Sequence, residues 1–166
     1  MTSFGGGWTM CYTTDSHVNI KTELTTTPKL GYRADCNNIP FTEVMFVDEE
    51  SKQKAAFTKD DGSPITFAGN YNKPNAESYG LWTANEDGVA TTDYKYQMLI
   101  CDTSFFKGLH FSGYTNNVYK SCDKWRKDMS SVYFRTSTLT KGYYGVAFNE
   151  NGHALVSNRL MSVGIR

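Results

Sequence analysis

Three consecutive glycines followed by a strand-like stretch constrain the fold of this chain most. The run reads Gly5-Gly6-Gly7-Trp8-Thr9-Met10-Cys11-Tyr12. Glycine adopts positive φ readily and lets another backbone approach closely, and the residues that follow are aromatic or β-prone. The run therefore predicts a tight entry into a buried strand, with the Trp8 side chain in the core.

The composition favours short strands and ordered loops over helices. The 166 residues include eleven Tyr, ten Phe and three Trp, with abundant Thr, Ser, Asn and Gly. Tyr and Trp present rigid amphipathic faces, as in many extracellular recognition domains, although a β-rich protein of any function fits the composition equally well. The length and the lack of a linker or internal repeat predict one domain over residues 1–166.

The charge balance argues against a nucleic-acid partner. Lys and Arg together number 17, and so do Asp and Glu, whereas a nucleic-acid binder usually carries a basic excess or stripe. The densest basic stretch, residues 120–127, is interrupted by Asp123 and favours a solvated surface. No apolar run approaches the 18 residues that a membrane-spanning helix needs, so we expect no membrane span.

Several segments have strand patterns. Residues 41–47 are nearly all apolar after Thr42 and Glu43, which predicts a central strand that is buried on both faces. After a polar turn at 48–52, residues 54–58 would return as its hairpin partner. The other expected strands are 94–101, 132–138, 143–148 and 160–166. In the last of these, apolar residues alternate with Ser162 and Gly164, which predicts one buried face.

The helix signal is weak and the middle of the chain has little periodicity. The best helix candidate is short, from about Asp123 to Met129, with Asp123 able to cap it. Residues 60–88 are rich in Pro, Asn and Gly, which predicts long ordered loops, and loops of that length are often functional. We therefore expect an α+β domain that is predominantly antiparallel β, with one or two short helices.

Four cysteines favour two disulfides and an oxidising, extracellular compartment. No pair of Cys11, Cys36, Cys101 and Cys122 has the C-x-x-C spacing of local zinc or redox motifs. The alternative is four buried free thiols. Four cysteines permit three disulfide connectivities, of which we take the sequential one, Cys11–Cys36 and Cys101–Cys122, as the working prediction.

The sequence lacks the common catalytic signatures. His17, His110 and His153 lie on separate segments, and there is no nucleophile elbow, phosphate loop or zinc-protease motif. A nucleophile built from distant Cys and His residues is the remaining enzymatic alternative. We expect no enzymatic activity.

Calcium is the candidate cofactor. Three polar runs, 60–63, 85–88 and 149–153, offer the carboxylate and amide oxygens that calcium prefers. Each also contains a glycine and has the pattern of an ordinary turn. The candidate metal ligands are Asp87, Glu150 and Asn151.

Aromatic side chains in expected loops are the candidate ligand contacts. Such side chains form platforms for sugar rings beside hydrogen-bonding groups. Trp125 lies near Cys122 and has a second interpretation as the cover of a disulfide. The candidates are Trp82, Tyr114, Trp125, Tyr143 and Tyr144.

The two ends of the chain resemble a known superfamily. The Gly-Gly-Gly-Trp-Thr string at 5–9 resembles the start of the conserved core of fibrinogen-like C-terminal domains and intelectin-type lectins. Residues 160–166 resemble the closing strand of those domains, and 145–149 with Gly152-His153 resemble the stretch before it. The chain looks most like a divergent invertebrate member of the lectin branch of this superfamily, and the candidate source is a cnidarian. The Asp-x-Asp calcium loop and the cysteine pattern of the family have no counterpart here.

The resemblance implies a secreted carbohydrate-binding domain whose partners are glycans or glycoproteins. A small lectin usually oligomerises so that several weak sites act together, so we expect a homo-oligomer. The runner-up is a structural or protein-interaction module of an extracellular matrix, because a fold does not dictate a function. An enzyme with a scattered active site is the third hypothesis.

Overall fold

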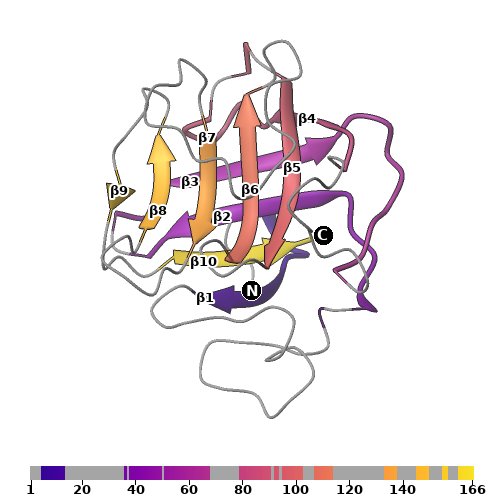
Figure 1. Ribbon diagram of the computed structural model, residues 1–166, viewed down its shortest axis with the longest axis horizontal. Coiled ribbons are helices and arrows are strands. Elements are labelled where there is room, and N and C mark those ends of the chain that lie inside the picture. The colour runs from indigo at the N-terminus through magenta and orange to yellow at the C-terminus, as the bar shows by residue number, and fades with distance from the viewer. Residues whose placement is uncertain are drawn as a thin grey trace.

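The computed structural model of the chain describes residues 5–13, 36, 38–49, 51–67, 79–90, 92–93, 95–102, 107–113, 133–137, 145–149, 155–156 and 161–166. Within these ranges the chain forms ten strands (Figure 1). They are β1 (Thr9–Thr13), β2 (Glu43–Asp48), β3 (Lys54–Lys59), β4 (Leu81–Ala84), β5 (Lys95–Asp102), β6 (Lys107–Gly113), β7 (Tyr133–Ser137), β8 (Gly145–Asn149), β9 (Leu155–Val156) and β10 (Met161–Ile165).

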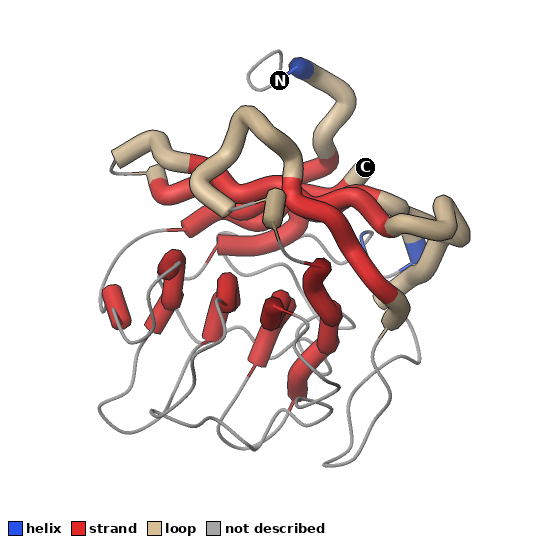
Figure 2. The backbone as a smooth tube through the Cα atoms, turned by 90° about the horizontal axis from the view of Figure 1, so that it is seen from above, coloured by secondary structure: helices blue, strands red, loops and turns tan. Residues whose placement is uncertain are grey.

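All ten strands belong to one antiparallel sheet in the order β1-β10-β2-β3-β4-β5-β6-β7-β8-β9. The order follows the sequence from β2 to β9, and β10 returns to pair between β1 and β2. Figures 1 and 2 show two layers, with β1, β10, β2 and β3 running across the direction of β5 to β9. Strands that cross in this way are typical of orthogonal sheet packing, in which the core lies between the layers.

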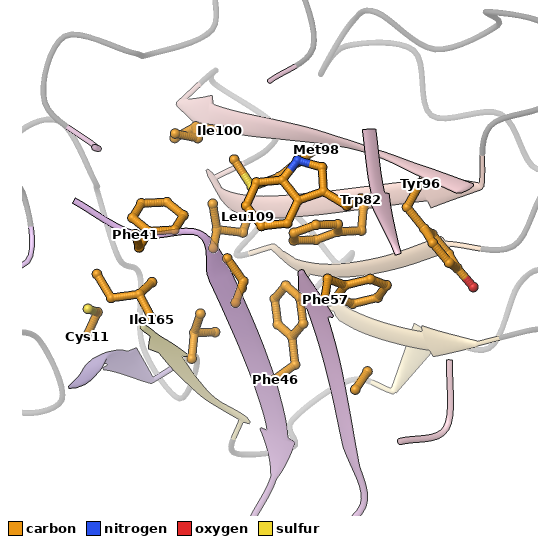
Figure 3. Packing of buried hydrophobic residues seen from close by; sticks show 14 of the residues in the cluster. Cys11, Phe41, Phe46, Phe57, Trp82, Tyr96, Met98, Ile100, Leu109 and Ile165 are labelled. Atoms are coloured by element: carbon orange, nitrogen blue, oxygen red, sulfur yellow. The ribbon is translucent and has the colours of Figure 1, made fainter. Parts of the chain in front are cut away.

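The core is built around aromatic side chains from both layers (Figure 3). Phe57 of β3 stacks on Phe111 of β6 with their ring centroids 4.2 Å apart. Phe46 and Trp82 meet the same ring edge-on, at 5.7 and 5.3 Å between centroids. Edge-to-face and offset-stacked rings are favourable arrangements, so Phe111 connects the two layers at the centre of the core.

The expected α+β class is wrong for the described part of the chain. Its regular structure is antiparallel β-sheet, and no α-helix occurs in the described ranges. The abundance of Thr, Tyr and Phe explains this result, because β-branched and aromatic side chains fit a pleated, half-buried surface. The helix expected at 123–129 lies outside the described residues.

The strand at 41–47 and its hairpin are confirmed. The strand begins at Glu43, and Phe41 forms an isolated bridge to Ile65. Alternate side chains of β2 enter two clusters on its opposite faces, with Val44 and Phe46 in the main core and Met45 and Val47 in a smaller outer cluster. The strands expected at 94–101, 132–138, 143–148 and 160–166 correspond to β5, β7, β8 and β10.

The single buried face expected for the last strand is wrong. Ser162 is only 7% exposed, while Val163 and Ile165 are fully buried on the other face. β10 lies between β1 and β2, and the outer-cluster side chains of these neighbours lie beside Ser162 and Gly164 on this face. A Cβ atom at Gly164 would lie 2.9 Å from Met10 Sδ, so the glycine allows the Met10 side chain to cover this face.

The glycine run enters a strand, β1, as the sequence predicts, but Thr9 and Met10 of that strand are only half-buried. Gly5, Gly6 and Gly7 all have positive φ, at 86°, 75° and 76°, a region that other residues adopt only at a steric cost. The side chain of Trp8 is 9% exposed and packs in the outer cluster with Met45, Val47 and Ala56.

A disulfide joins β1 to the core. Cys11 and Cys36 are bonded and buried, as the sequential pairing predicts. The register of β1 on β10 shifts between Met10 and Tyr12. Trp8 and Met10 belong to the outer cluster, so the alternation along the strand turns Cys11 into the main core.

Candidate functional site

A row of polar side chains crosses the outward face of the sheet where the two layers meet. Thr58 of β3 lies opposite Thr83 of β4, and Thr83 lies opposite Lys95 of β5. The neighbouring residues Phe57, Trp82 and Tyr96 are buried, so the alternation along each strand turns the three polar residues outward. With Asp60 and Asn85 they form a surface that we call the polar corner.

Hydrogen bonds hold the side chains of the polar corner to one another. The Thr83 hydroxyl donates to Asp60 Oδ1 at 2.6 Å, and Lys95 Nζ donates to Thr83 Oγ1 at 2.6 Å. Lys95 Nζ also lies 2.8 Å from Asp60 Oδ2. Beside this triad, the Thr58 hydroxyl donates to Asn85 Oδ1 at 3.0 Å. Because each group constrains its neighbour, the remaining donors and acceptors have set directions.

The carboxylate of Asp60 stays charged in this environment. Burial acts to raise its pKa, but hydrogen bonds from Lys95 and Thr83 outweigh that effect and hold the pKa below its ordinary value of 3.8. The polar corner therefore offers an anionic acceptor and a cationic donor side by side at neutral pH.

The turn after β3 fixes the position of Asp60. The Asp60 N–H donates to the Leu81 carbonyl at 2.9 Å, which ties the turn to β4. Next to it, Lys59 directs its ammonium to Asp61 and Ser63. The Lys59 hydrogen bond is also the main cause that lowers the pKa of Asp61. Lys59 and Asp61 thus form a second ion pair that supports the same turn.

One apolar side chain borders the polar corner. Leu81 is 37% exposed, and no other large hydrophobic side chain is exposed within the described ranges. It lies two residues before Thr83 on β4, so both side chains belong to the outward face of the sheet. Its partner in the register, Gln97, is only 6% exposed, so the accessible surface ends on that side.

The N-terminal motif forms a structural cluster of its own. The Arg166 guanidinium lies over the Trp8 ring, 4.5 Å from its centroid, and Nη1 donates to the Gly6 carbonyl at 3.1 Å. The same side chain pairs with Glu43. Stacking of Arg on Trp is a favourable cation–π contact. These contacts hold the entry of β1 against the last residue of the chain.

The sequence predicts Trp82 in a loop as a ligand contact, but the structure places it on β4 in the core. Its side chain is fully buried, and its indole N–H donates to the Tyr79 carbonyl at 2.9 Å. The alternation Leu-Trp-Thr-Ala at 81–84 is the signal for this strand, but Pro, Asn and Gly on its N-terminal side obscured it. The indole has no exposed face for a ligand.

Asp87 is exposed at a turn, and its carboxylate is paired with Lys54 of β3. Calcium would have to displace this ammonium. No group of three His, Cys, Asp or Glu side chains in the described part of the chain could hold a metal ion.

The other predicted ligand residues lie outside the described part of the structure. They are Tyr114, Trp125, Tyr143, Tyr144, Glu150 and Asn151. The predicted Cys101–Cys122 disulfide also lies outside it, because Cys122 and the side chain of Cys101 are not described.

The sequence patterns did not predict the polar corner. Thr58 lies in an expected strand, but its partners come from a region predicted to be loops and from the start of β5. The signal that could have found it is an outward polar residue on each of three consecutive strands. That signal becomes visible only once β4 is recognised.

The described residues include no helix with the length and apolar character to cross a membrane.

No family model, curated protein or solved structure matches the chain.

Proposed function

We propose that this chain is a secreted, non-catalytic domain that binds glycans. The observation that carries the proposal is the polar corner, where a carboxylate, an ammonium and hydroxyl groups are preset by mutual hydrogen bonds. Sugar hydroxyls are both donors and acceptors, so they pair best with a surface that offers both at fixed positions. A rigid strand scaffold keeps the entropic cost of such binding low.

Two further features support the proposal. The Gly-Gly-Gly-Trp-Thr string at 5–9, similar to that of fibrinogen-like domains and intelectin-type lectins, enters a strand that pairs with the closing strand β10. The buried Cys11–Cys36 disulfide suits an oxidising extracellular compartment. We propose that the domain acts as a homo-oligomer, since multivalency raises the avidity of weak sites.

The test is a broad glycan array of the purified, non-reduced protein, run with calcium and again with chelator. The expected result is binding to a defined set of glycans. Binding that is lost on chelation would assign a role to calcium and direct mutation to Asp87, Glu150 and Asn151. Binding that survives chelation would direct mutation to the polar corner.

A blank array under both conditions would contradict the proposal. In that case the matrix-module hypothesis leads, and its own readout is capture of a defined protein partner that survives glycosidase treatment. Light scattering of the eluted protein tests the oligomer separately, because a strict monomer would remove the avidity argument.

A further inference from the structure

The Asp60–Thr83–Lys95 triad has hydrogen-bonding capacity beyond its internal contacts. An ammonium has three N–H donors, and two of those on Lys95 serve Asp60 and Thr83 within the described structure. Each carboxylate oxygen has two lone pairs, and Asp60 Oδ1 and Oδ2 each accept one bond from the triad. The side chains of Lys95 and Asp60 are 50% and 29% exposed, so a ligand can reach both.

This donor and acceptor match two adjacent hydroxyl groups of a sugar ring. One hydroxyl accepts from Lys95 Nζ and its neighbour donates to Asp60. Hydrogen bonds to ionised groups are stronger than those between neutral groups, so this pairing fixes the orientation of the ring.

Leu81 supplies the apolar part of the surface. It is exposed on β4 two residues before Thr83, and the Leu81 carbonyl accepts the Asp60 N–H at 2.9 Å. A pyranose ring has hydroxyls at its rim and C–H groups on its faces. Leu81 can therefore pack against a C–H face while the triad holds the rim.

The local charge argues for a neutral sugar over an acidic one. Lys95 is paired with Asp60, and Lys59 with Asp61, so two cations and two anions sum to zero. A sialylated, uronic or sulfated glycan would find no excess positive charge here. The Lys59 ammonium is only 5% exposed while Asp61 is 64% exposed, so the anionic ligand would meet the Asp61 carboxylate more directly than the Lys59 ammonium.

We infer that the polar corner binds a neutral hexopyranose through two adjacent hydroxyls held by Asp60 and Lys95, with Leu81 against the ring. This inference rests on the proposed glycan-binding function. For a ligand of about twelve non-hydrogen atoms, we expect a dissociation constant on the order of 1 mM for each site.

The test titrates the full chain with methyl glucoside, galactoside and mannoside, and with N-acetylneuraminic acid and a sulfated galactose, followed by NMR. At least one neutral hexoside is expected to bind more tightly than both acidic sugars. Asp60→Asn and Lys95→Met should each weaken that binding about tenfold or more, because each removes a charged hydrogen-bond partner. Leu81→Ala should weaken it to a lesser degree.

The matched control is Lys52→Met, which removes the ammonium of the exposed Lys52–Glu49 pair in the β2–β3 hairpin. It should bind like the wild type, and thermal unfolding should confirm that every variant is folded. Glycan binding that tolerates Asp60→Asn and Lys95→Met, or that favours acidic sugars, overturns the inference and leaves the proposed function standing. No binding to any glycan on the array overturns the proposed function itself.

Discussion

At the scale of single residues, two buried polar groups are matched by partners nearby along the chain. The Trp82 indole N–H is satisfied by the carbonyl of Tyr79, three residues earlier. The Lys59 side chain is only 5% exposed, and its ammonium meets the carboxylate of Asp61, two residues later. A buried polar group without a partner costs free energy, so these short-range contacts allow both side chains to be buried.

The role of Trp82 as a core residue can be tested by Trp82→Phe. The change removes the indole hydrogen bond to the Tyr79 carbonyl and opens space beside Phe111, so the free energy of unfolding should fall by about 1–3 kcal/mol. Urea denaturation measures the effect. Leu81→Ala, at the next and exposed position, should change it by less than about 1 kcal/mol. A Trp82→Phe variant with wild-type stability would contradict the core role.

At the scale of elements, β1 is the least supported strand of the layer that contains β1, β10, β2 and β3. It lies at the end of the strand order and pairs only with β10 among the described strands. The Cys11–Cys36 bond compensates for this position, because it attaches β1 covalently to the segment that leads into β2.

The contribution of that bond can be measured with the double variant Cys11→Ala/Cys36→Ala. The bond closes a loop with a sequence separation of 25, and the chain-entropy model gives about 3 kcal/mol for a loop of this size. Denaturation without reductant should show a loss of this order. Equal stability of the variant and the wild type would show that packing alone holds β1.

Strand prediction succeeded where the signal was local and failed where other residues obscured it. The apolar run at 44–47 is unambiguous because both faces of β2 are buried. In β6, the buried Leu109 and Phe111 alternate with His110 and Ser112, but Gly108 and Gly113 weaken that pattern. β4 is four residues long, too short for a reliable period.

At the scale of the whole molecule, the candidate site depends on the register of three strands. Asp60 and Thr83 are 23 residues apart, and Thr83 and Lys95 are 12 apart. Their proximity follows from the pairing of β3, β4 and β5 at the junction of the two layers. No local pattern encodes this register, which explains why the sequence predicted most strands and missed the site.

The surface ion pairs make the stability of the domain sensitive to acid. Hydrogen bonds from Lys52 lower the pKa of Glu49, and those from Lys59 lower that of Asp61; the pKa of Asp60 is also lowered because Lys95 and Thr83 outweigh its burial. The folded state therefore binds protons less readily than the unfolded state. Stability should be full at neutral pH and decline as the pH falls below about 4.5, the ordinary value of Glu.

Urea denaturation between pH 7 and pH 3 checks this dependence. Asp61→Asn should flatten part of the decline, since that carboxyl no longer titrates. High salt should weaken the effect, because the Lys52–Glu49 and Lys95–Asp60 pairs are open to solvent and are screened. Stability that stays constant or rises toward pH 3 would contradict the assignment.

The neighbouring positions of β1 and β10 also determine how the domain would bear a pulling force. Thr9 lies opposite Ile165, so tension applied through both ends would peel the two strands apart and load their hydrogen bonds one after another. The peel would stop at Cys11, because the disulfide transmits the load to Cys36. From there the force would pass toward β2, so residues 12–35 would bear none of it while the bond remains intact.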